Sequence, residues 1–192
     1  MDERYELRNA RYLAAETMQR LIRPGDTVVD ATMGNGGDTV FLCRLTGEEG
    51  RVYAIDIQQE ALDRTRERIT AEGFESRVEF SLLGHQHLKE IVSGPIRAIM
   101  FNLGWLPGGN HECTTRVETT IEALSQATEC LMQGGIISVC VYPGHDEGTK
   151  ELEAVTGFCQ ALPVREYTVL RNTFINARQD TPQLFLIQKN RK

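Results

Sequence analysis

A run of ten residues, DATMGNGGDT at 30–39, places three glycines and an asparagine between two aspartates. The apolar residues before it, 27–29, fit a buried strand, and the apolar residues after it have helical spacing. Glycine in such a strand-to-helix turn lets the backbone take a positive φ and lets a ligand approach closely. The free amides at the start of the helix then face that ligand. The chemistry of the turn therefore depends on the ligand that the neighbouring side chains favour.

The side chains around the turn disfavour a phosphate-bearing ligand. A dinucleotide fingerprint needs glycines at 34, 36 and 39, but residue 39 is Thr, and no Gly-Lys-Ser/Thr follows. Asp30 would repel a pyrophosphate, whereas it suits a ligand with a cationic amine, which it can contact directly or through water. S-adenosylmethionine carries an α-amino group, a carboxylate and a sulfonium but no phosphate. Asp56, which ends the second expected strand, is placed to accept hydrogen bonds from the two ribose hydroxyls of that cofactor.

Helical and strand patterns alternate along the whole chain and predict an α/β fold. Helices are expected at 12–22, 38–46, 59–72, 87–92, 115–131 and 147–160, and strands at 27–31, 52–56, 78–82, 98–102, 136–142, 164–170 and 183–188. The pair Gly134-Gly135 is expected to stop the fifth helix. The alternation favours a parallel sheet with right-handed crossovers, and the last two strands favour an antiparallel hairpin. The prediction is a single domain, 1–192, with a seven-stranded, mostly parallel, Rossmann-like sheet and helices on both faces.

Composition and charge restrict the class of protein. The net charge of −6 argues against a broad nucleic-acid-binding face, but residues 161–192 carry six Lys or Arg against two Asp or Glu. The five cysteines form no C-x-x-C pair, which favours reduced thiols and a cytoplasmic protein. A charged N-terminus and the lack of a long apolar run favour neither a signal peptide nor a membrane span. His111-x-Cys113 and His85-x-His87 fit no common metal-site spacing, so no metal is expected.

The motifs are similar to those of class I methyltransferases. Asp30-x-x-x-Gly34-Asn35-Gly36 resembles their motif I, D-x-G-x-G-x-G, with Thr32 in place of the first glycine. Asp56-Ile57 resembles their ribose acid and adenine-flanking residue, and a reversed last strand is their hallmark. Together with GHQ at 84–86 and NLGWLPGG at 102–109, the turn resembles a narrower bacterial family, once labelled putative rRNA methylases. That family is associated with methylating 5-aminomethyl-2-thiouridine at the tRNA wobble position to its methylaminomethyl form.

This resemblance, together with the positions that follow the expected strands, implies two sets of site residues. N-methyltransferases of exocyclic amines often carry Asn-Pro-Pro-aromatic after the fourth strand. Here Asn102 and the Leu103 carbonyl would accept hydrogen bonds from the amine, and Trp105 would stack on the base. The residues expected to contact the cofactor are Asp30, Thr32, Gly34, Asn35, Gly36, Asp38, Thr39, Asp56, Ile57, Gln58, Gly84, His85, Gln86 and Asn102.

Several of these residues have alternative explanations. Asn102 can be a strand-end turn residue, and Trp105 can be a packed loop aromatic. Tyr142 can stack on a base or only end the fifth strand. His145, as a neutral imidazole, can accept the amine proton or can be a loop histidine without a catalytic role.

The expected function is N-methylation of an aminomethyl uridine in the tRNA anticodon loop. The basic residues considered for RNA contact are Arg165, Arg171, Arg178 and Lys189. Two subunits could pool these basic ends, so a homodimer is expected, as the resemblance also implies. The alternatives are methylation of rRNA, methylation of a small-molecule amine or hydroxyl, an oxidoreductase on a similar sheet, and a non-catalytic nucleotide-binding module.

Overall fold

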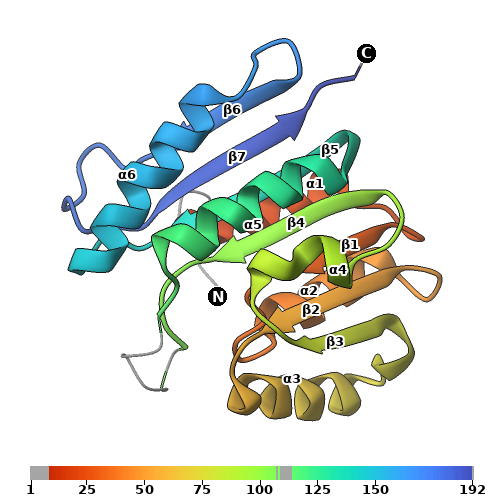
Figure 1. Cartoon of the computed structure of the whole chain (residues 1–192). Helices are drawn as coiled ribbons and strands as arrows, with labels where there is room; N and C mark the ends of the chain where they lie inside the picture. Colours follow the sequence, from red (N-terminus) through yellow and green to blue (C-terminus); the bar gives the residue numbers. More distant parts are fainter. Residues whose placement is uncertain (1–8, 107, 109–113, 192) are drawn as a thin grey trace, which may run out of the picture.

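Seven strands form one sheet in the computed structural model, which describes residues 9–106, 108 and 114–191 (Figure 1). The sheet order is β3-β2-β1-β4-β5-β7-β6. The strands from β1 to β5 are parallel, and β7 is antiparallel to both of its neighbours. The predicted fold, including the reversed last strand, is therefore confirmed. The strands are β1 (Thr27–Asp30), β2 (Arg51–Asp56), β3 (Val78–Leu82), β4 (Ile96–Asn102), β5 (Leu131–Val141), β6 (Tyr167–Asn172) and β7 (Gln183–Lys189).

Helices cover both faces of this sheet because the strands alternate their side chains between two cores. Val28 packs in one core with α1, α2 and α3, whereas its neighbour Val29 packs in the other with α4, α5 and α6. None of the helices within the described residues is long and apolar enough to cross a membrane. The helices are α1 (Ala10–Leu21), α2 (Gly37–Thr46), α3 (Gln59–Glu72), α4 (Leu88–Ile91), α5 (Val117–Cys130) and α6 (Asp146–Ala161), with 3-10 turns η1 (Glu75–Arg77) and η2 (His85–His87).

The glycine pair at 134–135 does not stop a helix, as the sequence predicted, but lies inside β5. The helix α5 ends at Cys130, and β5 begins at the next residue. Ile96 of β4 faces Leu131, whereas Ala98, two residues on, faces Ile136, so β5 carries a bulge between these pairs. Gly134 has φ +75°, and a Cβ atom at Gly135 would lie 2.9 Å from the carbonyl oxygen of Arg97. Both glycines are thus needed to fit the bulge against β4.

The sixth strand begins three residues later than predicted. The carbonyl oxygen of Pro163 accepts hydrogen bonds from the backbone N–H groups of Glu166 and Tyr167, each at 2.9 Å. Residues 163–166 are therefore a turn, and β6 starts at Tyr167. The hairpin that β6 forms with β7 is antiparallel, as predicted.

The sheet has its switch point at β1, because the chain runs outward from β1 through β2 to β3 and then returns to β4, on the other side of β1. In such sheets a crevice forms outside the carboxyl ends of the strands at this switch point. Asp30, Asp56 and Asn102 are the last residues of β1, β2 and β4. The fold therefore brings the three predicted site segments to one edge.

Candidate active site

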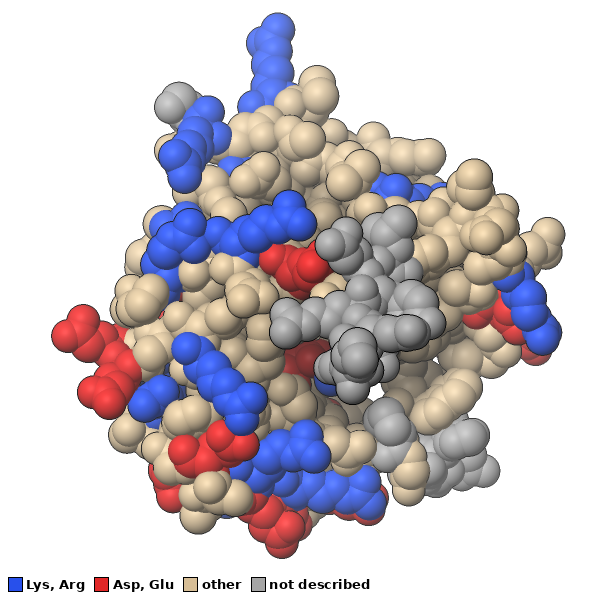
Figure 2. Space-filling view, turned by 180° about the vertical axis from the view of Figure 1, so that it is seen from behind, with Lys and Arg blue, Asp and Glu red and all other residues tan. Residues whose placement is uncertain are grey.

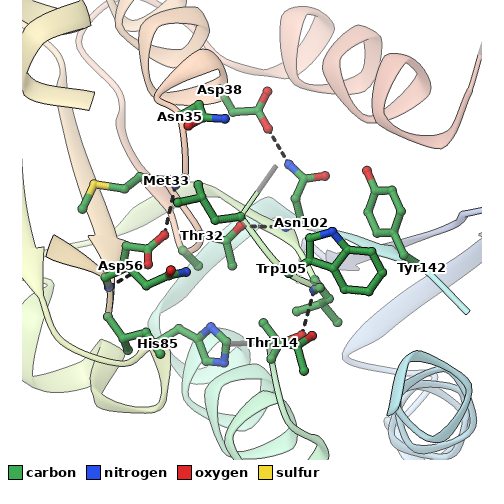
Figure 3. A pocket seen from close by; sticks show the side chains of 18 of the residues that line it. Thr32, Met33, Asn35, Asp38, Asp56, His85, Asn102, Trp105, Thr114 and Tyr142 are labelled. Atoms are coloured by element: carbon green, nitrogen blue, oxygen red, sulfur yellow. Dashed lines mark hydrogen bonds between the residues drawn. The ribbon is translucent and has the colours of Figure 1, made fainter. Parts of the chain in front are cut away.

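A cavity of about 950 Å³ opens at the carboxyl ends of β1, β2 and β4 (Figure 3). Most of the site residues predicted from the sequence line it, but Asp30, Gly36 and Thr39 do not. Pro107 and Gly109 of the segment 102–109, as well as His111 and Cys113, lie outside the described residues. The predicted residues that line the cavity are Thr32, Gly34, Asn35, Asp38, Asp56, Ile57, Gln58, Gly84, His85, Gln86, Asn102, Trp105, Tyr142 and His145.

The glycine turn uses its glycines for two different contacts. Gly34 has φ +50° and lines the cavity, where a Cβ atom would lie 3.4 Å from Cδ1 of Leu106. Gly36 has φ +75°, and a Cβ atom there would lie 3.0 Å from the Cα atom of Thr65. Gly36 therefore permits close packing against α3, whereas Gly34 keeps the cavity wall free of a side chain.

Asp56 connects the turn to the second strand. Its Oδ2 atom accepts a hydrogen bond from the Gly34 N–H at 3.0 Å, and its Oδ1 atom accepts one from the Gln58 N–H at 3.0 Å. Burial raises the pKa of Asp56, while these backbone hydrogen bonds oppose the rise. The carboxylate lines the cavity beside Ile57, whose side chain is 58% exposed. Each carboxylate oxygen can accept a further hydrogen bond, so this group fits a pair of ligand hydroxyls.

Asp30, the acid that the sequence placed beside the ligand, lies beneath the turn instead. It is fully buried, and its Oδ2 atom accepts a hydrogen bond from the Thr39 hydroxyl at 2.7 Å. Burial and the nearby charge of Asp38 raise its pKa to about 7. This placement excludes a direct contact between Asp30 and the cationic amine, one of the two possibilities that the sequence allowed. Thr39 also lies beneath the turn, because its hydroxyl donates to Asp30.

Asp38 is the acid of this segment that reaches the cavity. Its Oδ1 atom accepts hydrogen bonds from Nη2 and Nε of Arg11, at 2.7 and 3.1 Å. Its Oδ2 atom accepts a hydrogen bond from the Asn102 side-chain amide. Arg11 on α1 thus holds Asp38 on α2 in place, and Asp38 in turn orients the amide of Asn102 at the end of β4.

The amide of Asn102 is held so that its oxygen is left without a partner. Its Nδ2 donates to Asp38, and its backbone N–H donates to the Thr32 hydroxyl at 2.8 Å (Figure 3). The Oδ1 atom is buried and has no hydrogen-bond partner among the described residues. A buried carbonyl oxygen without a donor is costly, and its cost is removed when a ligand supplies an N–H or O–H group. The site therefore offers an oriented hydrogen-bond acceptor to whatever enters the cavity.

The wall opposite the glycine turn is aromatic. The rings of Trp105 and His145 lie with centroids 4.6 Å apart and planes at 47°. The Trp105 side chain is 37% exposed and lines the cavity together with Tyr142. Burial raises the pKa of Tyr142 to about 12, so its phenol stays neutral at physiological pH. These surfaces suit a flat, uncharged ring.

His145 is oriented as a helix cap rather than as a base. Its Nδ1 atom accepts a hydrogen bond from the backbone N–H of Gly148 at 3.1 Å, at the start of α6. A neutral imidazole that accepts through Nδ1 carries its hydrogen on Nε2, so it has no free lone pair for a proton. Of the two alternatives that the sequence left open for His145, this geometry favours the non-catalytic one.

His85 provides a neutral wall on the side of η2. It is buried, and its pKa is lowered to about 4 because burial disfavours the charged imidazole. Its ring meets the ring of Phe101 edge-on, with centroids 5.8 Å apart. The cavity surface here, which Gly84 and Gln86 complete, is uncharged and suits a heterocyclic base.

A buried carboxylate anchors the loop that carries Trp105. Glu151 on α6 accepts hydrogen bonds from the Thr115 hydroxyl at 2.8 Å and from the Thr120 hydroxyl at 2.6 Å. The Thr115 hydroxyl also accepts the N–H of Gly104 at 2.8 Å. This network joins the two ends of the loop to α5 and α6, so the aromatic wall is attached to the frame of the fold.

Sequence reasoning missed several lining residues. They come from α1, α3, the loop before α5, the first turns of α5 and the segment 102–109, and only Leu106 lies inside a motif, NLGWLPGG. For the others, only charge or polarity could have drawn attention to them. They are Arg11, Arg68, Leu106, Thr114, Thr115, Arg116 and Thr119. In the ranges that the structure describes, no three His, Cys, Asp or Glu side chains are grouped as a metal site would require.

Comparison with known proteins identifies the family. The family described as "Putative rRNA methylase" matches residues 52–188, and the ubiE/COQ5 methyltransferase family matches residues 8–95. A chloroplastic tRNA (mnm(5)s(2)U34)-methyltransferase from Arabidopsis thaliana is 38% identical over 179 residues, which are 88% of this chain. The chain spans 65% of the length of that relative, and 25% and 30% of the length of two ribosomal RNA small subunit methyltransferases that it matches.

Two solved structures are similar over nearly the whole chain. A putative rRNA methylase from Clostridium thermocellum has a TM-score of 0.93 and 43% identity, with 95% of this chain and 98% of that chain covered. A putative methyltransferase from Streptococcus mutans, solved in complex with S-adenosylhomocysteine (SAH), has a TM-score of 0.86 and 34% identity, with the same coverage. The glycine turn and the Asp56 carboxylate fit the parent cofactor of that product. The chain therefore belongs to the putative rRNA methylase family of S-adenosylmethionine-dependent methyltransferases.

Proposed function

We propose that this protein methylates the 5-aminomethyl group of a 2-thiouridine at the wobble position of tRNA. The observation that carries the proposal is the Oδ1 atom of Asn102, a residue that lines the cavity: this oxygen is buried and has no hydrogen-bond partner among the described residues. An amine can donate to this oxygen, whereas a second acceptor cannot. The name of the Arabidopsis relative, which specifies this nucleoside, supports the same substrate.

The residues around Asn102 would orient the amine for methyl transfer. Asn102 Oδ1 and the Leu103 carbonyl would accept its two N–H groups, which leaves the nitrogen lone pair directed at the methyl donor. S-adenosylmethionine, when bound, supplies a methyl group on a sulfonium and leaves as a neutral thioether. The new C–N bond forms as the C–S bond breaks, with the electron pair of that bond staying on sulfur. Trp105 would stack on the uracil ring, and the nitrogen gives up one proton.

The amine has to be neutral to react, and the hydrogen bonding of His145 indicates which group takes its proton. Because Nδ1 of His145 is occupied by the Gly148 N–H, that ring is not placed to take the proton. We infer that the amine loses its proton to solvent before it enters the cavity. The rate at subsaturating tRNA should then rise with pH until the amine of the free substrate is neutral.

The cofactor would be held by the turn and by the end of β2. Asp56 would accept the ribose hydroxyls, and Ile57 and His85 would border the adenine. The N–H groups at the start of α2 would face the methionine portion. Asp56→Ala should weaken cofactor binding, whereas Asn102→Ala should leave it nearly unchanged.

Methylation of ribosomal RNA is the second candidate, because the matching family carries that description. Labelled S-adenosylmethionine should be incubated with tRNA lacking the modification and with ribosomal RNA, and the nucleosides analysed. The proposal expects label only in methylaminomethyl-2-thiouridine from tRNA. Label in ribosomal RNA alone would contradict the proposal and favour methylation of ribosomal RNA. Label only in a small amine or alcohol would favour a small-molecule substrate.

The proposal also includes a cytoplasmic homodimer in which two subunits pool their basic ends. Light scattering with size-exclusion chromatography tests this part separately. A mass near twice the 21.6 kDa of the chain is expected, and a mass near that of one chain would contradict the dimer.

A further inference from the structure

Three arginines are among the residues that line the cavity, and of these only Arg11 has a partner within the described ranges. Arg11 is paired with Asp38 at 2.7 Å. Arg68 on α3 and Arg116 at the start of α5 are both exposed, and in the part of the chain that the structure describes neither guanidinium has a hydrogen bond or an ion pair. The cavity rim thus carries two uncompensated positive charges on two different elements.

The surroundings of Arg68 carry further positive charge. A Cβ atom at Gly37 would lie 3.0 Å from Nη2 of Arg11 and 3.5 Å from Nη1 of Arg68, so two guanidinium groups converge on the first residue of α2. The N-terminus of a helix adds partial positive charge at that place. Asp38 compensates one of the two cations, which leaves the other available to an anion.

The surface next to this point is a shallow hollow of about 600 Å³ that shares Arg68 and Asn35 with the cavity. Arg64 and Glu67 also line it. Arg64 is occupied by Asn35, at 2.9 Å, and by Glu60. Figure 2 shows Lys and Arg side chains gathered in the lower part of the face, where α3 lies, with acidic side chains among them. Arg68 is therefore the cation of this hollow that has no protein partner among the described residues.

Three cations of the basic C-terminal end, by contrast, are already engaged by contacts of their own. Arg171 donates to Gln183 at 2.9 Å and lies over the ring of Phe185. Lys189 donates to a backbone carbonyl at 2.9 Å, and Arg178 pairs with Asp180 at 3.1 Å. A cation already engaged in this way gains less from a new anion. The cations that are both unengaged and adjacent to the site are those at the rim.

We propose that Arg68 and Arg116 bind the RNA phosphodiesters that flank the target nucleotide. The inference rests on the proposed function, since a nucleotide that enters the cavity brings its two flanking phosphates to the rim. Arginine is suited to this contact because its planar guanidinium binds phosphate oxygens in pairs. These contacts would position the strand without reading its sequence.

The test measures binding of a fluorescent tRNA anticodon stem-loop over a series of KCl concentrations. Arg68→Gln and Arg116→Gln remove one rim charge each, and Arg20→Gln removes an exposed charge on α1, outside the cavity lining and the basic C-terminal end, as the matched control. Each rim variant is expected to weaken binding several-fold and to reduce the slope of log K against log salt by roughly 0.7, the value for one phosphate of a single strand. Arg20→Gln should keep the wild-type slope. Arg68→Lys should restore most of the affinity lost in Arg68→Gln.

A second arm distinguishes RNA phosphate from the methionine carboxylate of the cofactor. The affinity for S-adenosylhomocysteine should stay within about twofold of wild type in both rim variants. A loss of cofactor affinity with unchanged RNA binding would overturn the proposal and assign the arginine to the carboxylate. Wild-type salt slopes in both rim variants would also overturn it. The proposed function is tested separately by methyl transfer with the wild-type protein. That measurement does not depend on substituting Arg68 or Arg116.

Discussion

A single side-chain amide is the residue on which the proposed chemistry depends. The sequence suggested that Asn102 accepts hydrogen bonds from an amine, and the structure adds how the amide is oriented. Its nitrogen donates to Asp38, whose other oxygen is held by Arg11, so the amide oxygen is directed away from Asp38 and has no partner among the described residues. A reversed amide would place its N–H groups toward the substrate and its oxygen against a carboxylate, which is unfavourable.

The choice between the two acids of the glycine turn could not be made from the sequence. Asp30 occupies the motif position, but its side chain lies in the layer between the sheet and α2 and bonds to Thr39. Asp38 lies in the first turn of α2 and lines the cavity. Which acid faces the ligand depends on how the turn is rotated against the strand, and spacing alone does not determine that rotation.

His145 provides a test at the residue scale. His145→Asn should leave the pH profile of kcat unchanged in shape, because the ring accepts from Gly148 and does not take a proton. Asn is also a good helix cap, so the free energy of unfolding should stay within roughly 0.5 kcal/mol, whereas His145→Ala should lower it by about 1 kcal/mol. Loss of an inflection from the pH profile of His145→Asn alone would identify the ring as a base.

At the scale of elements, the sequence predicted the type of each strand and helix because hydrophobic periodicity and turn residues agreed. The predicted helix 59–72 and strand 78–82 have those bounds in the structure. The prediction was wrong at Gly134-Gly135, since glycines end helices and form bulges by the same freedom of φ. Only the pairing partner β4 shows which use applies. The contribution of α1 to the site was equally inaccessible, because its contact with α2 is long-range.

The packing of the glycine turn against α3 gives a prediction for Gly36. Gly36→Ala should lower the free energy of unfolding by about 2–3 kcal/mol, since it combines a positive φ with a clash against the Thr65 backbone. Gly73→Ala is the matched control, because Gly73 has φ +71° and open space around it. That variant should lose only about 1 kcal/mol. Equal losses in urea denaturation would show that the contact with α3 does not matter.

At the scale of the whole molecule, the carboxyl ends of the parallel strands gather the site, and this was predictable. The α/β pattern and the switch-point rule placed 30–38, 56–58, 84–87, 102–109 and 142–145 at one edge, and the cavity formed there. The distribution of usable charge was not predictable. Arg171, Arg178 and Lys189 at the C-terminal end have contacts of their own, while the guanidinium groups of Arg68 and Arg116 at the rim have no hydrogen bond or ion pair within the described ranges.

The burial of Asp30 predicts a pH dependence of stability. Its pKa is about 7 in the folded protein and about 3.9 in an unfolded chain, so its contribution to stability is present at low pH and is lost as pH rises between these values. His85 acts in the opposite sense, because burial lowers its pKa. The difference in unfolding free energy between wild type and Asp30→Asn isolates the Asp30 contribution. From pH 5 to pH 8, the wild type should lose stability relative to Asp30→Asn. A difference that does not depend on pH would contradict the raised pKa of Asp30.

The most direct test of the account is the single-turnover rate of methyl transfer to aminomethyl-modified tRNA by Asn102→Ala, with cofactor affinity measured in parallel. Asn102 Oδ1 is proposed to orient the amine, so the rate should fall by roughly a hundredfold. The affinity for S-adenosylmethionine should stay within a few-fold of wild type. A rate equal to wild type would contradict the role of this amide and the proposed mechanism.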